Sequence, residues 1–148
     1  MERPELGYLL TRLVRVVIAR EEPIFERAGL RMWDYVVLSA LAGNDAPTQA
    51  QLAAQAGRDK TRLIGNLDRL EELGLVNRAP DPADRRNRVV SLTPEGRRVH
   101  GRCRAAIHEM EDDLLRDVPA GDRAAFERAL TTLTGSLDET APHPSAGS

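Results

Sequence analysis

Basic and polar side chains that could bind an anion gather in one short stretch of this sequence. Arginine can donate two parallel hydrogen bonds to guanine or to a phosphate, and asparagine can pair with adenine in the same way. At 3.6 residues per turn, one helical face presents Thr61, Arg62, Gly65, Asn66 and Arg69, and Lys60 precedes them in the first turn. We predict base-edge contacts for Arg62 and Asn66, with Thr61 assisting. Lys60 and Arg69 are predicted to hold phosphates.

The opposite face of the same stretch is apolar and must lie against a core. Its members fall within an arc of roughly 120°: they are Leu63, Ile64, Leu67 and Leu70. Asp59 has the side chain of an N-cap, and Gly74 is placed to end the helix. For an isolated helix, the simpler interpretation of the charged face is that water solvates it, so the neighbouring elements decide between the two.

A second short helix is predicted just before this one. Thr48 with Gln51 three residues later fits a capping box, in which each side chain bonds the other's backbone N–H. Gly57 and Arg58 then provide a tight turn, so the two helices form a helix-turn-helix pair. At the start of the first helix, Thr48 and Gln49 are predicted to offer donors to a DNA phosphate.

A β-hairpin with a basic tip is predicted to follow the pair. Its strands are Val76–Ala79 and Val89–Leu92, joined by a polar turn over residues 81–87. Arg85 and Arg86 lie at the tip, where an arginine can enter the narrow, negative minor groove of an A·T-rich flank. Helix, turn, polar-faced helix and basic hairpin in this order indicate a winged helix-turn-helix.

The acidic residues of the hairpin turn are predicted to shape it. Asp81 and Asp84 would repel a phosphate if they carried unpaired charge, so we expect them to pair with nearby arginines. Arg88 and Arg78, which flank the strands, are the expected partners.

These segments resemble the MarR family of bacterial transcriptional regulators. The matching segments are "GLRMWDYVVLSALA", "TQAQLA", "DKTRLIGNLDRLEELGLV" and "DPADRRNRVVSLTPEG", of which the last, the wing, is the most specific. The resemblance extends roughly from Leu6 to Leu137. It departs from the family's pattern at Ala83, where many members have arginine, and at Gly65, where members often have a larger polar residue.

The resemblance implies a fold, a partner and a mode of action. The fold is mainly α with a small β-hairpin wing, and members pair through both terminal regions. A homodimer would bind double-stranded DNA at a pseudo-palindromic operator with half-sites about 10–10.5 bp apart, acting as a repressor. Members commonly bind small aromatic or amphipathic ligands near the second helix, so Trp33 and Tyr35 are the expected pocket residues; packing in a core or interface is the alternative for both.

The rest of the chain is expected to provide the dimer interface. An N-terminal dimerisation region is predicted over residues 1–30, with a helix that Pro23 kinks or restarts. The DNA-binding lobe follows over residues 31–93. C-terminal dimerisation helices are predicted over residues 94–137, the first of them running from Pro94 to about Asp117, and a disordered tail over residues 138–148.

Charge is distributed unevenly along the 148 residues, whose net charge is −2. Residues 58–104 hold 12 Lys and Arg against 7 Asp and Glu, a net charge of +5, whereas residues 105–148 hold 3 against 9, a net charge of −6. The positive charge therefore lies in the predicted DNA-binding element. A single cysteine excludes an intramolecular disulfide, and no apolar run reaches the roughly 18 residues of a membrane span. These features predict a cytoplasmic protein without a membrane partner.

Other functions find less support in the sequence. No nucleophile elbow, phosphate-binding glycine loop or metal-ligand cluster is present, so we expect neither an enzyme nor a cofactor. His100 and Cys103 lie three residues apart, but a zinc site needs three or four ligands, and we expect both at the surface or a dimer interface. The alternative function is a small-molecule or metal-responsive dimer that acts through protein contacts instead of DNA.

Overall fold

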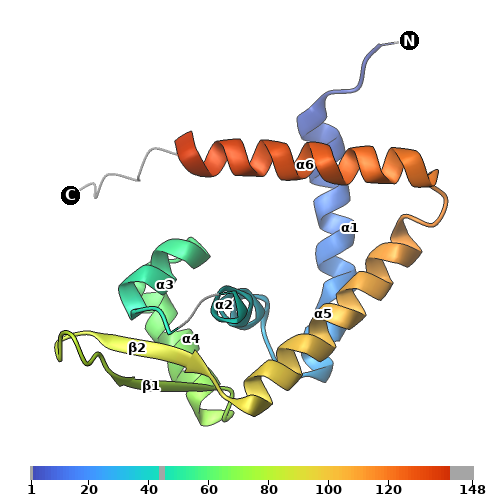
Figure 1. Ribbon diagram of the computed structural model, residues 1–148. Coiled ribbons are helices and arrows are strands. Elements are labelled where there is room, and N and C mark those ends of the chain that lie inside the picture. Colours follow the sequence, from blue (N-terminus) through green and yellow to red (C-terminus); the bar gives the residue numbers. More distant parts are fainter. Residues whose placement is uncertain (1, 44–45, 141–148) are drawn as a thin grey trace. The chain divides into compact units, whose positions relative to one another are not determined.

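The computed structural model describes residues 2–43 and 46–140, the last five of these by their backbone alone. Six helices and one two-stranded antiparallel sheet make up the described part of the chain (Figure 1). In order they are α1 (Leu6–Arg27), α2 (Met32–Ala42), α3 (Gln49–Ala56), α4 (Lys60–Glu72), β1 (Val76–Pro80), β2 (Arg88–Leu92), α5 (Pro94–Leu114) and α6 (Ala120–Thr140). The predicted fold class, mainly α with a hairpin wing, is confirmed.

The chain divides into two compact units, residues 1–110 and 111–148. The first contains α1 to α4, the hairpin and most of α5. The second contains α6, where Arg123 links the end of α5 to α6 by bonding Asp112 at 2.7 Å and Glu127 at 3.0 Å. Helix α6 continues through residues 138–140, where the sequence suggested the start of a tail, and residues 141–148 lie outside the described residues.

The core of the first unit is built mostly from leucine and valine. Helices α2, α3 and α4 each bury an apolar face, the hairpin adds two valines, and one face of α5 closes the cluster. The side chains buried most completely are Val37, Leu38, Leu52, Leu63, Leu67, Leu70, Val76 and Val90. The apolar face predicted for residues 63–70 therefore packs as expected, with Ile64 half-buried at its margin.

The hairpin is fixed beside the start of α3. Its register pairs Val76 with Leu92 and Pro80 with Arg88, so that Val90 points into the core. The Val90 N–H donates to the Pro47 carbonyl at 2.9 Å, and Thr48 forms an isolated bridge with β2. The wing and the first helix of the pair are thus held together by backbone hydrogen bonds.

A tight joint connects the end of α4 with the start of α5. Thr93 donates its N–H to the Leu75 carbonyl at 3.0 Å and its hydroxyl to the Gly74 carbonyl at 2.6 Å. The backbone of Gly96 lies so close to that of Leu75 that a Cβ at position 96 would be 2.0 Å from the Leu75 carbonyl oxygen. Gly74 has a φ of +74°, which glycine adopts without strain. Both glycines are required by this geometry.

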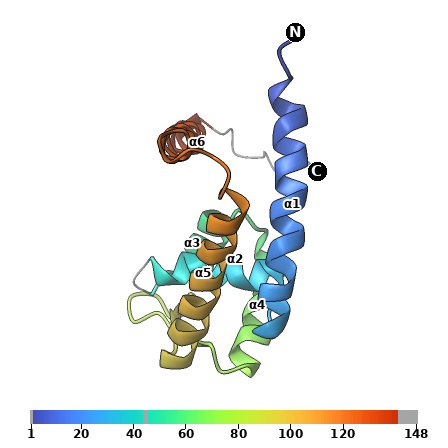
Figure 2. The ribbon, with the colours of Figure 1, turned by 90° about the vertical axis from the view of Figure 1, so that its right-hand side faces the viewer.

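Helix α1 corrects the expectation of a break at Pro23. It is a single helix from Leu6 to Arg27 that passes through the proline (Figure 2). Pro23 and Ala19 are both exposed, so the carbonyl left without its helical partner can be hydrated, and Phe25 anchors the following turn in the core. Within the described part of the chain, no helix is both long and apolar enough to cross a bilayer.

Candidate nucleic-acid interface

The first turn of α4 presents polar side chains to solvent. Asp59 caps the helix, its Oδ1 accepting the Arg62 N–H at 3.0 Å, as predicted. Gly57 has a φ of +63°, which allows the chain to turn sharply before the cap. Lys60, Thr61 and Arg62 are all exposed. The helix therefore offers two cations and a hydroxyl at its positively polarised N-terminal end.

The start of α3 also carries the predicted cap. The Gln51 N–H donates to Thr48 Oγ1 at 3.2 Å, and the Thr48 N–H donates to Gln51 Oε1 at 2.9 Å. Thr48 and Gln49 are half-buried. Gln49 Oε1 is a buried side-chain oxygen without a hydrogen-bond partner among the described residues.

Asn66 does not face solvent as the sequence suggested. It is 9% exposed, its Nδ2 donates to Asp34 Oδ1 at 2.9 Å, and its Oδ1 accepts from Arg58 Nε at 2.8 Å. Both ends of the amide are thus occupied inside the protein. The predicted contact between Asn66 and a base edge is not available in this conformation.

Arg69 is also turned inward, toward the start of α2. Its Nε donates to Asp34 Oδ2 at 3.1 Å, and its Nη2 donates to the Gly29 carbonyl at 2.9 Å. A guanidinium held in this way connects α4 to the α1–α2 loop. These bonds give Arg69 a structural role, and its predicted phosphate contact stays a prediction.

Asp34 is the centre of this arrangement, and sequence reasoning missed it. Its side chain is 0% exposed, and besides Asn66 and Arg69 it accepts the Arg31 N–H at 2.8 Å. A buried carboxylate needs several donors, because burial removes the water that would otherwise solvate its charge. An acidic residue inside the otherwise apolar segment of α2 was the signal that could have identified it.

The wing tip is exposed and its turn is shaped by aspartates. Arg85 and Arg86 are both exposed at the tip. Asp84 Oδ1 accepts from the Arg86 backbone N–H at 3.1 Å and from its Nε at 3.2 Å. Asp81 Oδ1 accepts the Ala83 N–H at 2.9 Å. The two aspartates thus order the turn as predicted, although Asp81 does so through a backbone group.

The two arginines expected to pair with these aspartates lie elsewhere. Arg78 donates to Asp68 at 2.5 Å and to Glu71 at 3.1 Å, so it fastens β1 to α4. Its hydrogen bond lowers the pKa of Glu71, and the charge of Arg88 adds to that effect. Arg88 is exposed on β2. The hairpin is thereby clamped onto the helix that it accompanies.

Trp33 and Tyr35 each pack against side chains of other elements. The guanidinium carbon of Arg58 lies 4.4 Å from the centroid of the Trp33 ring. Tyr35 packs between Phe25 and His100, with ring centroids 5.1 and 5.4 Å away, and burial raises its pKa. These contacts fit packing, which is the alternative that the sequence left open, and a ligand beside either ring stays a prediction.

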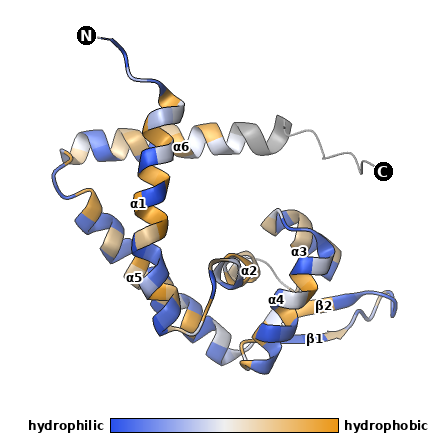
Figure 3. Cartoon of the chain, turned by 180° about the vertical axis from the view of Figure 1, so that it is seen from behind, coloured by the Kyte–Doolittle hydropathy of each residue, from blue (hydrophilic) through white to orange (hydrophobic). Residues whose placement is uncertain are grey.

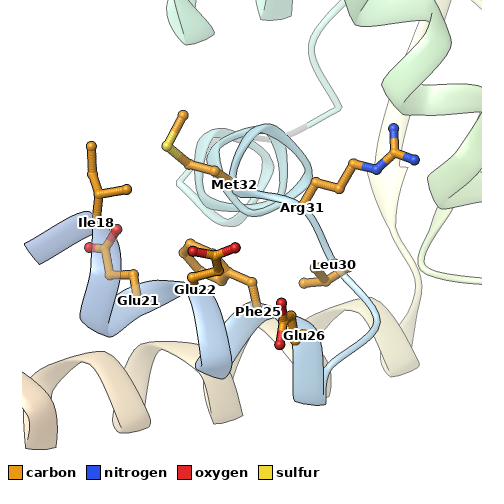
Figure 4. Close-up of a pocket in the computed structure, with 8 residues that line it drawn as sticks. All are labelled: Ile18, Glu21, Glu22, Phe25, Glu26, Leu30, Arg31 and Met32. Carbon is orange, nitrogen blue, oxygen red and sulfur yellow. The ribbon is translucent and has the colours of Figure 1, made fainter. Parts of the chain in front are cut away.

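A pocket of about 440 Å³ lies instead between the last turns of α1 and the start of α2 (Figure 4). Its walls combine apolar side chains with three glutamates and one arginine: Ile18, Glu21, Glu22, Phe25, Glu26, Leu30, Arg31 and Met32. The α1–α2 loop that closes it is the same loop whose Gly29 carbonyl accepts from Arg69. The pocket and the buried Asp34 cluster thus share a wall.

The sequence predicted His100 and Cys103 at the surface or at a dimer interface. Both instead lie in the core of the first unit. They are 7% and 3% exposed. His100 Nε2 lies 3.1 Å from Ser39 Oγ, and burial lowers its pKa. Burial also raises the pKa of the Cys103 thiol, which disfavours the reactive thiolate. Within the described residues, no three metal-binding side chains converge.

Comparison with known proteins shows which family this chain resembles. The MarR family profile matches residues 28–87. The transcriptional regulator HosA of Escherichia coli O111:H- is 42% identical over 105 residues, which cover 71% of this chain and 67% of HosA. The transcriptional repressor NicR of Pseudomonas putida is 29% identical over 141 residues, which cover 93% of this chain and 86% of NicR.

Solved structures agree with these relatives. The transcriptional repressor CouR, bound to a 23-mer DNA duplex, superposes with a TM-score of 0.79 at 28% identity, covering 88% of this chain and 92% of CouR. CouR from Rhodococcus jostii RHA1, bound to p-coumaroyl-CoA, superposes with a TM-score of 0.73 at 30% identity, covering 87% of this chain and 91% of that one.

Proposed function

This chain belongs to the MarR family of transcriptional regulators, and from that premise we propose that it represses transcription as a homodimer bound to operator DNA. Helix α4 enters the major groove, and the wing follows the flanking minor groove. Two-fold symmetry brings two copies of α4 to consecutive major grooves, so the operator is pseudo-palindromic with half-sites about 10–10.5 bp apart. The protein acts where the DNA lies, in the cytoplasm.

The exposed cations of α4 and the wing carry this proposal. Lys60 and Arg62 stand on the first turn of α4, while Arg85 and Arg86 stand at the wing tip. All four are exposed; Arg62 and Arg86 pair only with the local Asp59 and Asp84, and the carboxylates of Asp68 and Glu71 are bound by Arg78. Arg62 is the residue that we assign to base edges, with Thr61 beside it. Lys60, Arg85 and Arg86 are assigned to phosphates and the minor groove.

A small ligand is proposed to release the DNA. The pocket between α1 and α2 has about the volume of small-molecule sites and mixes apolar and charged walls. It is bounded by the loop that Arg69 of α4 grips through the Gly29 carbonyl. An aromatic or amphipathic occupant that displaced this loop would shift α4, and it would release DNA if it bound the displaced form more tightly.

The proposal is tested by binding to the DNA upstream of the protein's own gene. Labelled fragments of that DNA and of a scrambled sequence are titrated over a range of salt concentrations. We expect sequence-selective binding that weakens steeply as salt rises, and a footprint with two-fold symmetry. The variant Arg62→Ala should lose selectivity between the fragments, whereas Arg102→Ala, which alters an exposed arginine of α5, should not. Absence of binding to either fragment at low salt would contradict the proposal.

A further inference from the structure

One arginine of the helix-turn-helix is held in place without being neutralised. Several arginines of this chain are bonded to carboxylates: Arg62 to Asp59, Arg69 to Asp34, Arg78 to Asp68 and Glu71, Arg86 to Asp84, and Arg98 to Glu95. Arg58, in the turn between α3 and α4, differs from them. Among the residues that the structure describes, no carboxylate forms an ion pair with it.

Two neutral side chains fix the position of Arg58. Its guanidinium lies over the face of Trp33, 4.4 Å from the ring centroid, and its Nε donates to Asn66 Oδ1 at 2.8 Å. Asn66 is itself held by Asp34, through a 2.9 Å bond from Nδ2 to Oδ1. The flexible side chain is therefore ordered while its full positive charge is kept.

Arg58 is half-buried, and most of its donors form no hydrogen bond within the described residues. Only Nε is occupied by a hydrogen bond within the described residues, which leaves the two Nη groups. The residue precedes the cap of α4 by one position and Lys60 by two, so it lies beside the positively polarised end of that helix. The guanidinium is already ordered and has no carboxylate partner among the described residues. It is therefore well placed to bind an anion that passes the N-terminal end of the helix.

We propose that Arg58 is a contact for a DNA phosphate and that Trp33 and Asn66 are its positioning residues. This inference rests on the proposed binding of duplex DNA. It also gives a role to Trp33 and to the buried Asn66, the two side chains that contact Arg58. Because a phosphate contact is independent of sequence, Arg58 strengthens binding to every duplex and contributes no selectivity.

The test measures non-specific binding, for which no operator is needed. A labelled duplex of random sequence is titrated with the full-length wild type and with Arg58→Gln over a salt series, and circular dichroism verifies folding. We expect the slope of log affinity against log salt to become less negative by about one unit, because one phosphate contact is lost. Arg102→Gln is the matched control, since it removes one exposed cation from α5, and it should keep the wild-type slope.

The positioning residue is tested by a second pair of variants. Trp33→Phe keeps an aromatic face for the guanidinium, whereas Trp33→Leu removes it. We expect Trp33→Leu to bind the random duplex several-fold more weakly and Trp33→Phe to bind nearly as the wild type does. If Arg58→Gln does not fold, this pair still tests whether an ordered Arg58 strengthens DNA binding.

The outcomes separate this inference from the function on which it rests. A wild type whose binding does not depend on salt would contradict the DNA-binding function itself. A wild type with a steep slope, together with a folded Arg58→Gln that shares that slope and affinity, would overturn the phosphate contact alone. Equal affinities of Trp33→Leu and Trp33→Phe would overturn the positioning role.

Discussion

At the scale of single residues, the arginines of this chain are distinguished by their partners. Arg69 and Arg78 are bonded to acids within the protein and act as structural clamps. Arg62 and Arg86 touch only local aspartates, and their side chains are 72% and 90% exposed, so those weak pairs can be exchanged for contacts with DNA. Residue type alone could not separate the two groups, because the distinction depends on which acid the fold brings close.

Arg86 provides the first prediction at this scale. Arg86→Ala should weaken operator binding by roughly 1–3 kcal/mol and flatten its salt dependence, because a wing cation leaves the minor groove. Fluorescence anisotropy over a salt series measures both quantities. Arg98→Ala, at the start of α5, is the control, because it too removes an exposed, acid-paired arginine. Unchanged affinity and slope for Arg86→Ala would refute the wing assignment.

His100 gives a prediction about pH. Burial lowers its pKa below the usual 6.5, and the charge of Arg104 adds to the shift. The unfolded chain therefore binds a proton more readily than the folded one, so this contribution to stability is full above pH 6.5 and is lost as pH falls below it. Glutamine does not titrate, so as pH falls below 6.5 the free energy of unfolding of His100→Gln should fall less than that of the wild type. Urea titrations across that range measure the difference, and parallel curves would contradict the assignment.

At the scale of elements, most of the fold follows from local signals. The caps at Thr48 and Asp59, the turn at Gly57 and the strand pattern each act over a few residues, so the sequence contains them in full. The burial of Asn66 does not follow in this way. At 100° per residue it lies only about 40° from Leu70, at the edge of the apolar face. Asp34, which draws it inward, is 32 positions away in the chain.

The contribution of Asp34 to the contact between α2 and α4 can be measured as a change in the free energy of unfolding. Asp34→Ala leaves Arg69 and Asn66 without their acceptor, and we expect a loss of about 2–3 kcal/mol. This is less than for a fully buried pair, because the Arg69 side chain is 36% exposed and water can reach it. Asp68→Ala breaks an ion pair whose carboxylate is 58% exposed and should cost at most about 1 kcal/mol. Equal losses in urea unfolding would contradict the central role of Asp34.

Two glycines of α5 should respond in opposite directions to the same change. Gly96→Ala places a Cβ against the Leu75 carbonyl, so the joint must open and the melting temperature should fall. Gly101→Ala meets no atom within 4 Å, and alanine favours a helix by up to about 1 kcal/mol, so the melting temperature should rise. Thermal unfolding followed by circular dichroism compares them. A Gly96→Ala variant as stable as the wild type would show that the joint is looser than described.

At the scale of the whole molecule, the described chain exposes apolar side chains that one copy does not cover. Orange bands along α1 in Figure 3 mark its hydrophobic positions. The large apolar residues that α1 exposes are Leu6, Tyr8, Leu9, Val14, Val16 and Ile18. Helix α6 adds Phe126, Leu130 and Leu133, which are also exposed. Such surfaces usually mark an interface, and their place in both terminal regions fits the dimer that we propose.

Dimerisation predicts that stability depends on concentration. Because a partner binds only the folded chain, the melting temperature should rise as protein concentration increases. Leu9→Glu places a charge on the exposed apolar face of α1 and should reduce that dependence. Calorimetry at several concentrations measures it, with the size of the particle checked by light scattering. A melting temperature independent of concentration in the wild type would argue for a monomer.

The joint between α4 and α5 has a consequence for how such a protein can be switched. Thr93 grips the Gly74 and Leu75 carbonyls, and Gly96 leaves no gap that a side chain could fill. Because this joint is tightly packed, we expect the first turn of α5 and the end of α4 to move together. A tilt of α5 would then displace the far end of α4, where Lys60 begins the helix.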